Sequence, residues 1–128
     1  MGKGQTFLSE SEKTPSGEDK RHLRIIITNP NENNEYLVVS VTTWYDGVRG
    51  QDPSCILPAR CHSFIKHKSW VDFSRSRAMT YIEIFNGLRR GFLVNKEDLD
   101  PALIQSIQGA ASISEFIPEE LMTFFEFF

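Results

Sequence analysis

Two short runs of β-branched residues, separated by a turn-rich stretch, place the strongest limit on the fold of this chain. The first run, Leu23–Thr28, is too short for a stable helix, and its isoleucines favour a buried strand. Asn29–Asn34 is dominated by Asn and contains one Pro, which is typical of a turn. Tyr36–Trp44 is the second strand, so the two runs predict an antiparallel hairpin. Within this strand, side chains alternate between a side with Leu37, Val39, Val41 and Thr43 and a side with Tyr36, Val38, Ser40 and Thr42.

More short strand patterns follow this hairpin. Cys55–Leu57 is a brief strand ended by a proline, and Ser69–Phe73 and Ala78–Phe85 are rich in aromatic and β-branched residues. Asn86-Gly87 is a strong turn signal, with a short return strand through Phe92–Val94. Many short strands with irregular loops and no long helix between them favour an antiparallel barrel over a parallel α/β sheet. We therefore expect a mainly β protein with helices at its C-terminal end.

The sequence divides into three parts. Residues 1–20 are polar and weakly periodic, so we expect a flexible N-terminal arm, with Thr6–Leu8 at most a short edge strand. Residues 21–94 hold the β-barrel. Residues 95–128 predict a helical extension packed on the barrel, with one helix beginning at Asp100-Pro101 and ending near Gly109, and a second within Ser114–Phe128. The aromatic segment Phe124–Phe128 is expected to cap the core, or else to form a dimer or partner interface.

Charge is distributed unevenly along the chain. The net charge is −3, but residues 56–92 carry seven basic and two acidic side chains. A basic segment within an acidic protein is compatible with binding a phosphate backbone. A run of charged residues is also typical of an ordinary solvent-exposed surface. No run approaches the ~20 apolar residues of a membrane helix, and two cysteines are too few for a disulfide scaffold. We expect a cytoplasmic protein with free thiols and no membrane partner.

Two groups of residues resemble the PemK/MazF growth-inhibitor toxins. The first is His22–Thr28 followed, after a turn, by Leu37–Thr43; in that family a basic residue precedes a hydrophobic strand, and the next strand ends in a Thr or Ser pair. The second comprises Asp52–Leu57, His62–His67 and Ser69–Phe73, which looks like a divergent PemK-like subgroup of bacterial or phage-borne proteins. The resemblance covers roughly residues 21–81.

The resemblance implies a small SH3-like antiparallel β-barrel that often forms homodimers and is neutralised by a cognate antitoxin protein. It further implies a metal-independent endoribonuclease that cleaves single-stranded RNA, including mRNA, in a toxin–antitoxin or phage-related system. The catalytic Thr or Ser of the family maps to Thr42, or less well to Thr43. The position of the family's catalytic arginine holds His22 in this chain. An alternative is therefore a barrel that binds protein or nucleic acid without catalysis.

Metal-free RNA cleavage by the 2′-hydroxyl needs a base, an acid and a group that neutralises the phosphate. Histidine suits the first two roles near neutral pH, arginine binds phosphate in a bidentate manner, and aromatic side chains stack on bases. The catalytic candidates are His22, Thr42, His62, His67 and Arg75. The RNA-binding candidates are Lys66, Lys68, Arg77, Trp44 and Trp70. In the working hypothesis, His22 pairs with His62 or His67, while Thr42 and Arg75 hold the phosphate, and no cofactor or metal takes part.

Each of these residues also has a structural interpretation. Single histidines are more often structural than catalytic, strand threonines reflect β-propensity, and aromatic side chains usually belong to the core. Cys55, Cys61, His62 and His67 are the right residue types for a zinc-stabilised module. Their spacing fits poorly, because Cys61 and His62 are adjacent and no C-x-x-C pair is present.

Overall fold

A computed structural model describes residues 1–13 and 15–128 and shows a mainly β protein. Its strands are β1 (Thr6–Leu8), β2 (Glu12–Lys13), β3 (Asp19–Lys20), β4 (Leu23–Ile26), β5 (Glu35–Thr43), β6 (Ile56–Leu57), β7 (Ser69–Thr80) and β8 (Val94–Lys96). Its helices are α1 (Tyr81–Arg90), α2 (Pro101–Ile113) and the 3₁₀ helix η1 (Glu119–Phe127).

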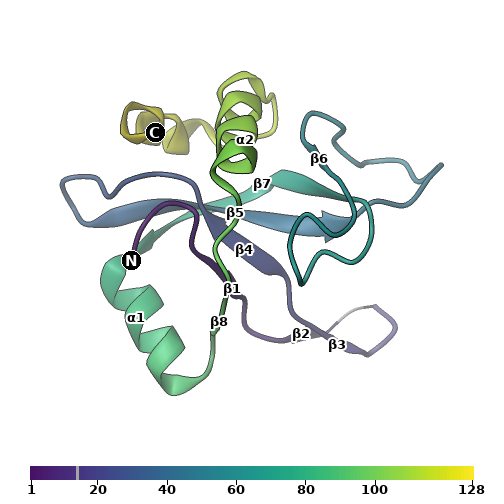
Figure 1. Cartoon of the computed structure of the whole chain (residues 1–128), viewed down its shortest axis with the longest axis horizontal. Coiled ribbons are helices and arrows are strands. Elements are labelled where there is room, and N and C mark those ends of the chain that lie inside the picture. Colours follow the sequence, from purple (N-terminus) through teal and green to yellow (C-terminus); the bar gives the residue numbers. More distant parts are fainter. Residues whose placement is uncertain (14) are drawn as a thin grey trace.

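Six strands form one antiparallel sheet in the order β6-β7-β5-β4-β1-β8, which curls into a half-barrel (Figure 1). The hairpin predicted from the two β-branched runs is confirmed, since β4 pairs antiparallel with β5 and Leu23 lies opposite Val41. The expected short strand at Cys55–Leu57 is present as β6. Strands β2 and β3 form a separate two-stranded ribbon.

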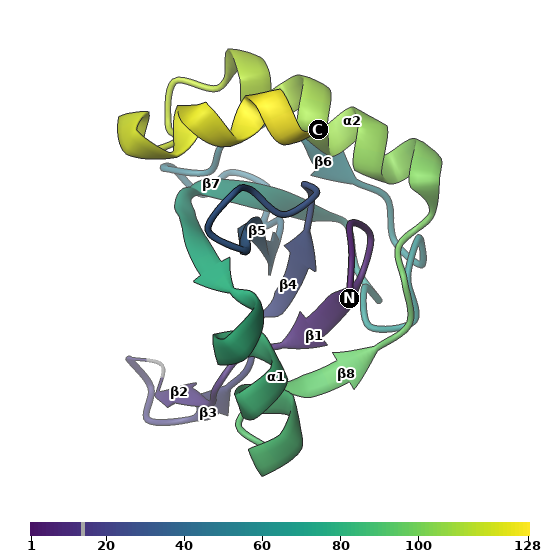
Figure 2. The same cartoon turned by 90° about the vertical axis from the view of Figure 1, so that its left-hand side faces the viewer.

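Apolar side chains fill both faces of the sheet. Figure 2 shows α2 and η1 over one face, and α1 with the β2–β3 ribbon on the opposite side. The larger core, beneath α2 and η1, includes Leu23, Ile25, Leu37, Val39, Val41, Val71, Phe73, Ile104, Ile107, Leu121 and Phe124. The smaller core, against α1, consists of Phe7, Ile26, Tyr36, Val38, Met79, Ile84 and Leu93. The predicted alternation along β5 is therefore confirmed, because its odd-numbered apolar residues lie in the first core and Tyr36 and Val38 in the second.

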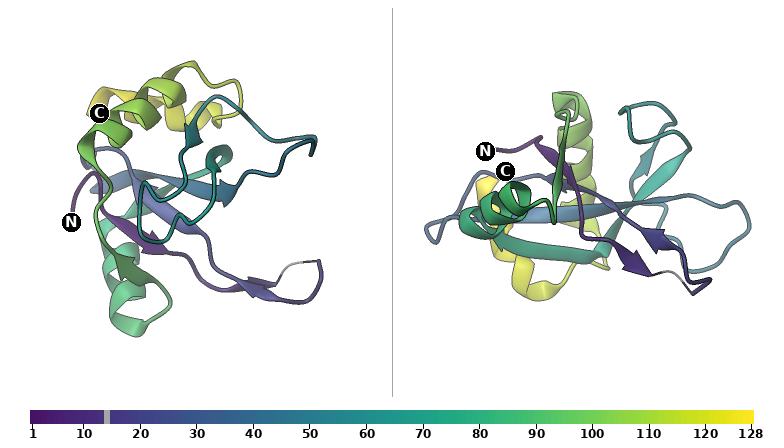
Figure 3. Two further views of the ribbon diagram at one scale, coloured as in Figure 1. Left: turned by 45° about the vertical axis from the view of Figure 1, so that its right-hand side comes forward. Right: turned by 90° about the horizontal axis from the view of Figure 1, so that it is seen from below.

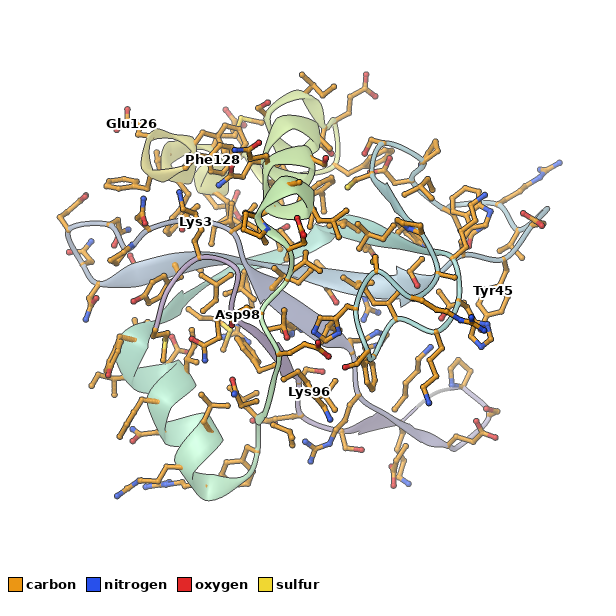
Figure 4. The ribbon with its side chains drawn as sticks, viewed as in Figure 1. Lys3, Tyr45, Lys96, Asp98, Glu126 and Phe128 are labelled. Carbon is orange, nitrogen blue, oxygen red and sulfur yellow. The ribbon has the colours of Figure 1, made fainter. Side chains whose placement is uncertain are left out.

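The C-terminal helices pack on the sheet. The Asp100 side chain caps α2 by accepting a hydrogen bond from Ala102 N at 2.8 Å, and the helix continues past Gly109. In η1 the Phe124 side chain is buried, and Phe127 O accepts a hydrogen bond from Asn29 N at 2.8 Å. Figure 4 shows Phe128 beside α2, with Glu126 on the outside. The aromatic end of the sequence thus contributes to the core.

The N-terminal segment is more ordered than its composition indicates. Strand β1 lies inside the sheet, between β4 and β8, and not at an edge. The Phe7 and Thr6 side chains are completely buried. A strand of three residues is too short for a periodicity signal, and its burial depends on partners about 17 and 88 residues away. The rest of the expected arm contributes the β2–β3 ribbon, and Thr14 lies outside the described residues.

The strand expected over Ala78–Phe85 is wrong beyond Thr80. There β7 ends and α1 begins, because Thr80 and Glu83 form a capping box: Glu83 N donates to Thr80 Oγ1 at 3.1 Å, and Thr80 N donates to Glu83 Oε1 at 3.1 Å. Asn86-Gly87 lies within this helix and forms no hairpin turn. Burial of Ile84 and the left-handed conformation of Gly91 define the helix face and its end.

Replacing Gly87 with Ala is expected to destabilise the protein although alanine favours helices. A Cβ at Gly87 would lie 2.6 Å from Leu93 Cδ1 and 2.7 Å from its Cγ. The gain in helix propensity is about 1 kcal/mol, whereas overpacking costs about 1–3 kcal/mol. We expect the free energy of unfolding in urea to fall by about 1 kcal/mol.

Gly109, in α2, is the matched control, because a Cβ there meets no atom within 4 Å. Gly109→Ala should stabilise the protein by up to about 1 kcal/mol. If the free energy of unfolding changed equally and in the same direction in the two variants, the proposed clash of a Cβ at Gly87 with Leu93 would be contradicted.

A large bulge interrupts the pairing of β5 with β7. Arg77 lies opposite Val38 and Asp72 opposite Ser40, so two steps along β5 correspond to five along β7. Bulges bend a strand and redirect its side chains, and they are frequent next to functional sites. The expected break between two strands, after Phe73, is thus a bulge within one continuous strand.

Candidate functional site

A large hollow lies where β4 begins. It has a volume of about 590 Å³, and the β2–β3 ribbon projects beside the loop that leads into β7 (Figure 3). We call it the His22 hollow. It is lined by Leu8, Asp19, Lys20, Arg21, His22, Leu23, Val41, Thr42, Thr43, Phe64, Ile65, Lys66, His67 and Ser69.

A smaller hollow of about 160 Å³ adjoins it on the face of the sheet that carries α1. It is lined by His22, Ser40, Thr42, Trp70, Asp72 and Arg75, so it shares His22 and Thr42 with the larger one. The strand register explains this set, because Thr42 lies opposite Trp70 and Ser40 opposite Asp72. The bulge in β7 adds Arg75, whose Nε lies 3.7 Å from Asp72 Oδ2.

Backbone hydrogen bonds position His22. Its N–H donates to Ser9 Oγ at 3.0 Å, and its carbonyl oxygen accepts from Ser9 N at 2.9 Å. Ser9 is buried, and the next residue, Leu23, pairs with Val41 in the sheet. The imidazole of His22 therefore extends from a fixed point of the backbone, next to Thr42.

Two buried donors in the walls of these hollows lack hydrogen-bond partners. Within residues 1–13 and 15–128, neither Arg21 Nη1 nor Trp70 Nε1 has an acceptor. A buried donor without a partner costs about 1–3 kcal/mol, and such a group in a folded protein calls for an explanation. Arg21 lines the larger hollow and Trp70 the smaller one, so each hollow has one unpartnered donor in its wall.

The loop before β7 adds two exposed cationic or titratable side chains, Lys66 and His67. Ser69 Oγ fixes its backbone by donating to His67 O at 2.8 Å. The side chain of the next loop residue, Lys68, lies over Trp44, with its Nζ 5.5 Å from the centre of the ring. Lys68 and Trp44 are both RNA-binding candidates from the sequence, but neither lines the His22 hollow.

His62 lies apart from the other candidates. Its ring is buried, with Nε2 at 2.8 Å from Glu97 O and 3.2 Å from Thr6 Oγ1, while Nδ1 accepts from Phe64 N at 3.0 Å. Both ring nitrogens are thus engaged, which indicates that the hydrogen sits on Nε2. His62 ties β1 and the segment after β8 to the loop before β7, and we leave it out of the site.

The four candidate zinc ligands do not come together. Within residues 1–13 and 15–128, no three His, Cys, Asp or Glu side chains are arranged to hold a metal ion. Burial, with a further contribution from the Asp52 charge, raises the pKa of Cys55 to about 11. Burial also raises the pKa of Cys61. Both thiols are free, and a raised pKa opposes the thiolate form that zinc requires.

The structure changes the set of RNA-binding candidates. Trp70 is buried, so it offers an N–H and not a stacking face. Arg77 lies further along the same face of the sheet, 3.3 Å from Glu83. Lys20, Arg21 and the exposed ring of Phe64 line the hollow and were missed. The run Lys20-Arg21-His22, directly before a hydrophobic strand, was the signal that could have indicated the first two.

Comparison with known proteins does not identify this site. A scan against protein-family models and a search of curated proteins found no match for the chain. In the part of the chain that the structure describes, no helix has the length and apolar character needed to cross a membrane.

Proposed function

We propose that this protein is a metal-independent endoribonuclease of the PemK/MazF type, acting on single-stranded RNA in the His22 hollow. One observation carries the proposal. His22 and Thr42 stand between two adjoining hollows whose walls bring together basic side chains and two unpartnered donors. Such a site suits a phosphodiester, because cations and fixed N–H groups stabilise the charge that builds up on phosphorus-bound oxygen.

The chemistry can be assigned to named side chains. His22 and His67 form the acid–base pair: one imidazole removes the proton of the ribose 2′-hydroxyl, and its oxygen attacks the adjacent phosphorus. The bond from phosphorus to the 5′-oxygen breaks, and the other imidazole, as imidazolium, protonates that oxygen. The products are a 2′,3′-cyclic phosphate and a 5′-hydroxyl, so no co-reactant is needed.

The remaining residues bind the substrate. In the smaller hollow, Thr42 and Arg75 contact the phosphate oxygens, and the N–H group of Trp70 gains an acceptor. Arg21 supplies its unpartnered N–H in the larger hollow. Lys66 adds positive charge at the rim of the larger hollow, where Phe64 is exposed and available to stack on a base. Asp19 is the one carboxylate among the lining residues of that hollow, and Lys13 Nζ lies 3.4 Å from it.

The purified protein is expected to cleave single-stranded RNA in excess EDTA. The fragments should end in 2′,3′-cyclic phosphate, because the 2′-hydroxyl is the nucleophile. Electrophoresis of a labelled oligonucleotide measures the cleavage, and mass spectrometry of the fragments identifies their ends. The same oligonucleotide with 2′-O-methyl groups is the control and should stay intact. Binding without cleavage at any RNA sequence would instead favour a non-catalytic barrel that binds nucleic acid.

The toxin role belongs to the same proposal. The half-barrel is assigned as a divergent form of the SH3-like PemK/MazF barrel, with a protein antitoxin and a second copy of the chain as its partners. Induced expression in a bacterial host should then arrest growth with loss of mRNA. Continued growth with intact mRNA, at expression levels where the protein is folded, would contradict the toxin role.

A further inference from the structure

A third hollow lies on the same face of the sheet, beside α1. It has a volume of about 360 Å³, and we call it the Phe92 hollow. Three arginines, Arg24, Arg77 and Arg90, contribute to its lining together with the aromatic ring of Phe92. Arginine with an exposed aromatic ring is the combination that binds one nucleotide of a single strand, since the cation meets the phosphate and the ring stacks on the base.

The strand register places this hollow in line with the proposed active site. Arg24 in β4 follows His22, the residue just before this strand, by two positions, and extended backbone places such side chains on one face, about 7 Å apart. Arg24 pairs with Ser40, which lines the smaller hollow of the active site. Ser9, which holds the backbone of His22, also lines the Phe92 hollow. The three hollows therefore follow one another across the sheet.

Phe92 is held in an exposed position by its neighbours. Gly91 adopts φ 80° at the end of α1, and Leu93 N donates to Gly87 O at 3.0 Å. Leu93 is buried in the smaller core, whereas 53% of Phe92 is exposed. The backbone on both sides of Phe92 is thus fixed, and the ring is presented to solvent at the hollow.

Carboxylates in this hollow do not prevent phosphate binding. Glu83 lies 3.3 Å from Arg77, and Glu10 is the other acidic residue of the lining. Side chains of the Arg77–Glu83 pair are 52% and 47% exposed, and exposed pairs contribute little to stability. A phosphate can therefore replace Glu83 as the partner of Arg77 at small cost.

We infer that the Phe92 hollow is a second nucleotide subsite, which binds the single-stranded RNA substrate away from the scissile phosphate. This inference rests on the proposed function. The RNA runs along the face of the sheet that carries α1, with the reacting phosphate near His22 and Thr42, and a neighbouring nucleotide stacked on Phe92. Oligonucleotides that span both places bind more tightly than those that fill only the active site.

Binding of uncleavable RNA tests the inference. The probes are 2′-O-methyl oligonucleotides of three and ten nucleotides, measured by fluorescence anisotropy at several salt concentrations. Phe92→Leu keeps an apolar side chain but removes the stacking face, and should weaken binding of the ten-nucleotide probe about 5- to 150-fold. Arg90→Ala should reduce the salt dependence of that binding by about 0.7 in log–log slope. Binding of the three-nucleotide probe should stay unchanged in both variants.

Matched controls are Arg89→Ala, at an exposed arginine that does not line the hollow, and Phe116→Leu, at an exposed phenylalanine beside α2. Wild-type affinity for the long probe in Phe92→Leu and Arg90→Ala would overturn the subsite, while cleavage by the wild type would leave the proposed function standing. Wild-type protein that neither binds nor cleaves RNA would overturn both. Long-probe binding that depends on Phe92, without cleavage, would support the subsite and contradict the ribonuclease.

Discussion

His22→Ala is expected to lower the rate of RNA cleavage about 100- to 10,000-fold, the usual contribution of a general acid or base. His22 lines both hollows of the site, and Ser9 holds its backbone in place. His22→Gln should be as slow as His22→Ala, because the amide forms hydrogen bonds but does not transfer protons. Single-turnover cleavage of a labelled oligonucleotide measures the loss.

The matched variant is His67→Ala, which should be slowed to a similar degree. The double variant should lose much less than the product of the two single effects, because an acid and a base act as a unit. Binding of 2′-O-methyl RNA should change only a few-fold in all of these variants. Full cleavage activity in His22→Gln would show that His22 transfers no proton.

His62→Ala is expected to lower the free energy of unfolding by about 2–4 kcal/mol. The variant loses the bonds to Glu97 O and Thr6 Oγ1, leaves Phe64 N without its acceptor, and creates a cavity in the buried interior. Urea denaturation followed by circular dichroism measures the change. Cleavage per folded molecule should remain within a few-fold of the wild type.

For the exposed His67 we expect the opposite result: a loss of activity with little change in stability. His67→Ala should change the free energy of unfolding by no more than about 0.5 kcal/mol while abolishing most of the activity. The two histidines thus separate stability from catalysis. A His62→Ala protein of normal stability but without cleavage activity would show that His62 takes part in catalysis.

Local sequence patterns predicted the elements that local interactions determine. The hairpin of β4 and β5 follows from alternation and a turn, and both faces of β5 were assigned correctly. α1 was missed because its residues have high β-propensity, and the capping box of Thr80 and Glu83 with burial of Ile84 prevails over that preference. β1 was misplaced because only distant partners decide that three residues form an interior strand.

The candidate site could be predicted in part for the same reason. His22, Thr42 and Arg75 do line one hollow. Strand register places Thr42 opposite Trp70, whereas Arg75 comes from the bulge in β7. His62 could not be separated from His67 by sequence, because they differ only in how the loop between them folds. Lys20 was assigned to the N-terminal arm, and Arg21 was not among the site candidates, although both line the His22 hollow.

The central position of β1 has a consequence for the order of events during synthesis. Its two partners are β4, which follows closely, and β8, which is made only after about 85 further residues. Pairings between such distant segments form late, because the intervening chain must first be closed into a loop. On the ribosome, β4 and β5 can pair early, but the sheet edge that receives β8 stays open until residues 94–96 have emerged. Ser9 follows directly after β1, so the proposed catalytic histidine would acquire its final position only after residues 94–96 have emerged, which would delay RNA cleavage by a nascent chain.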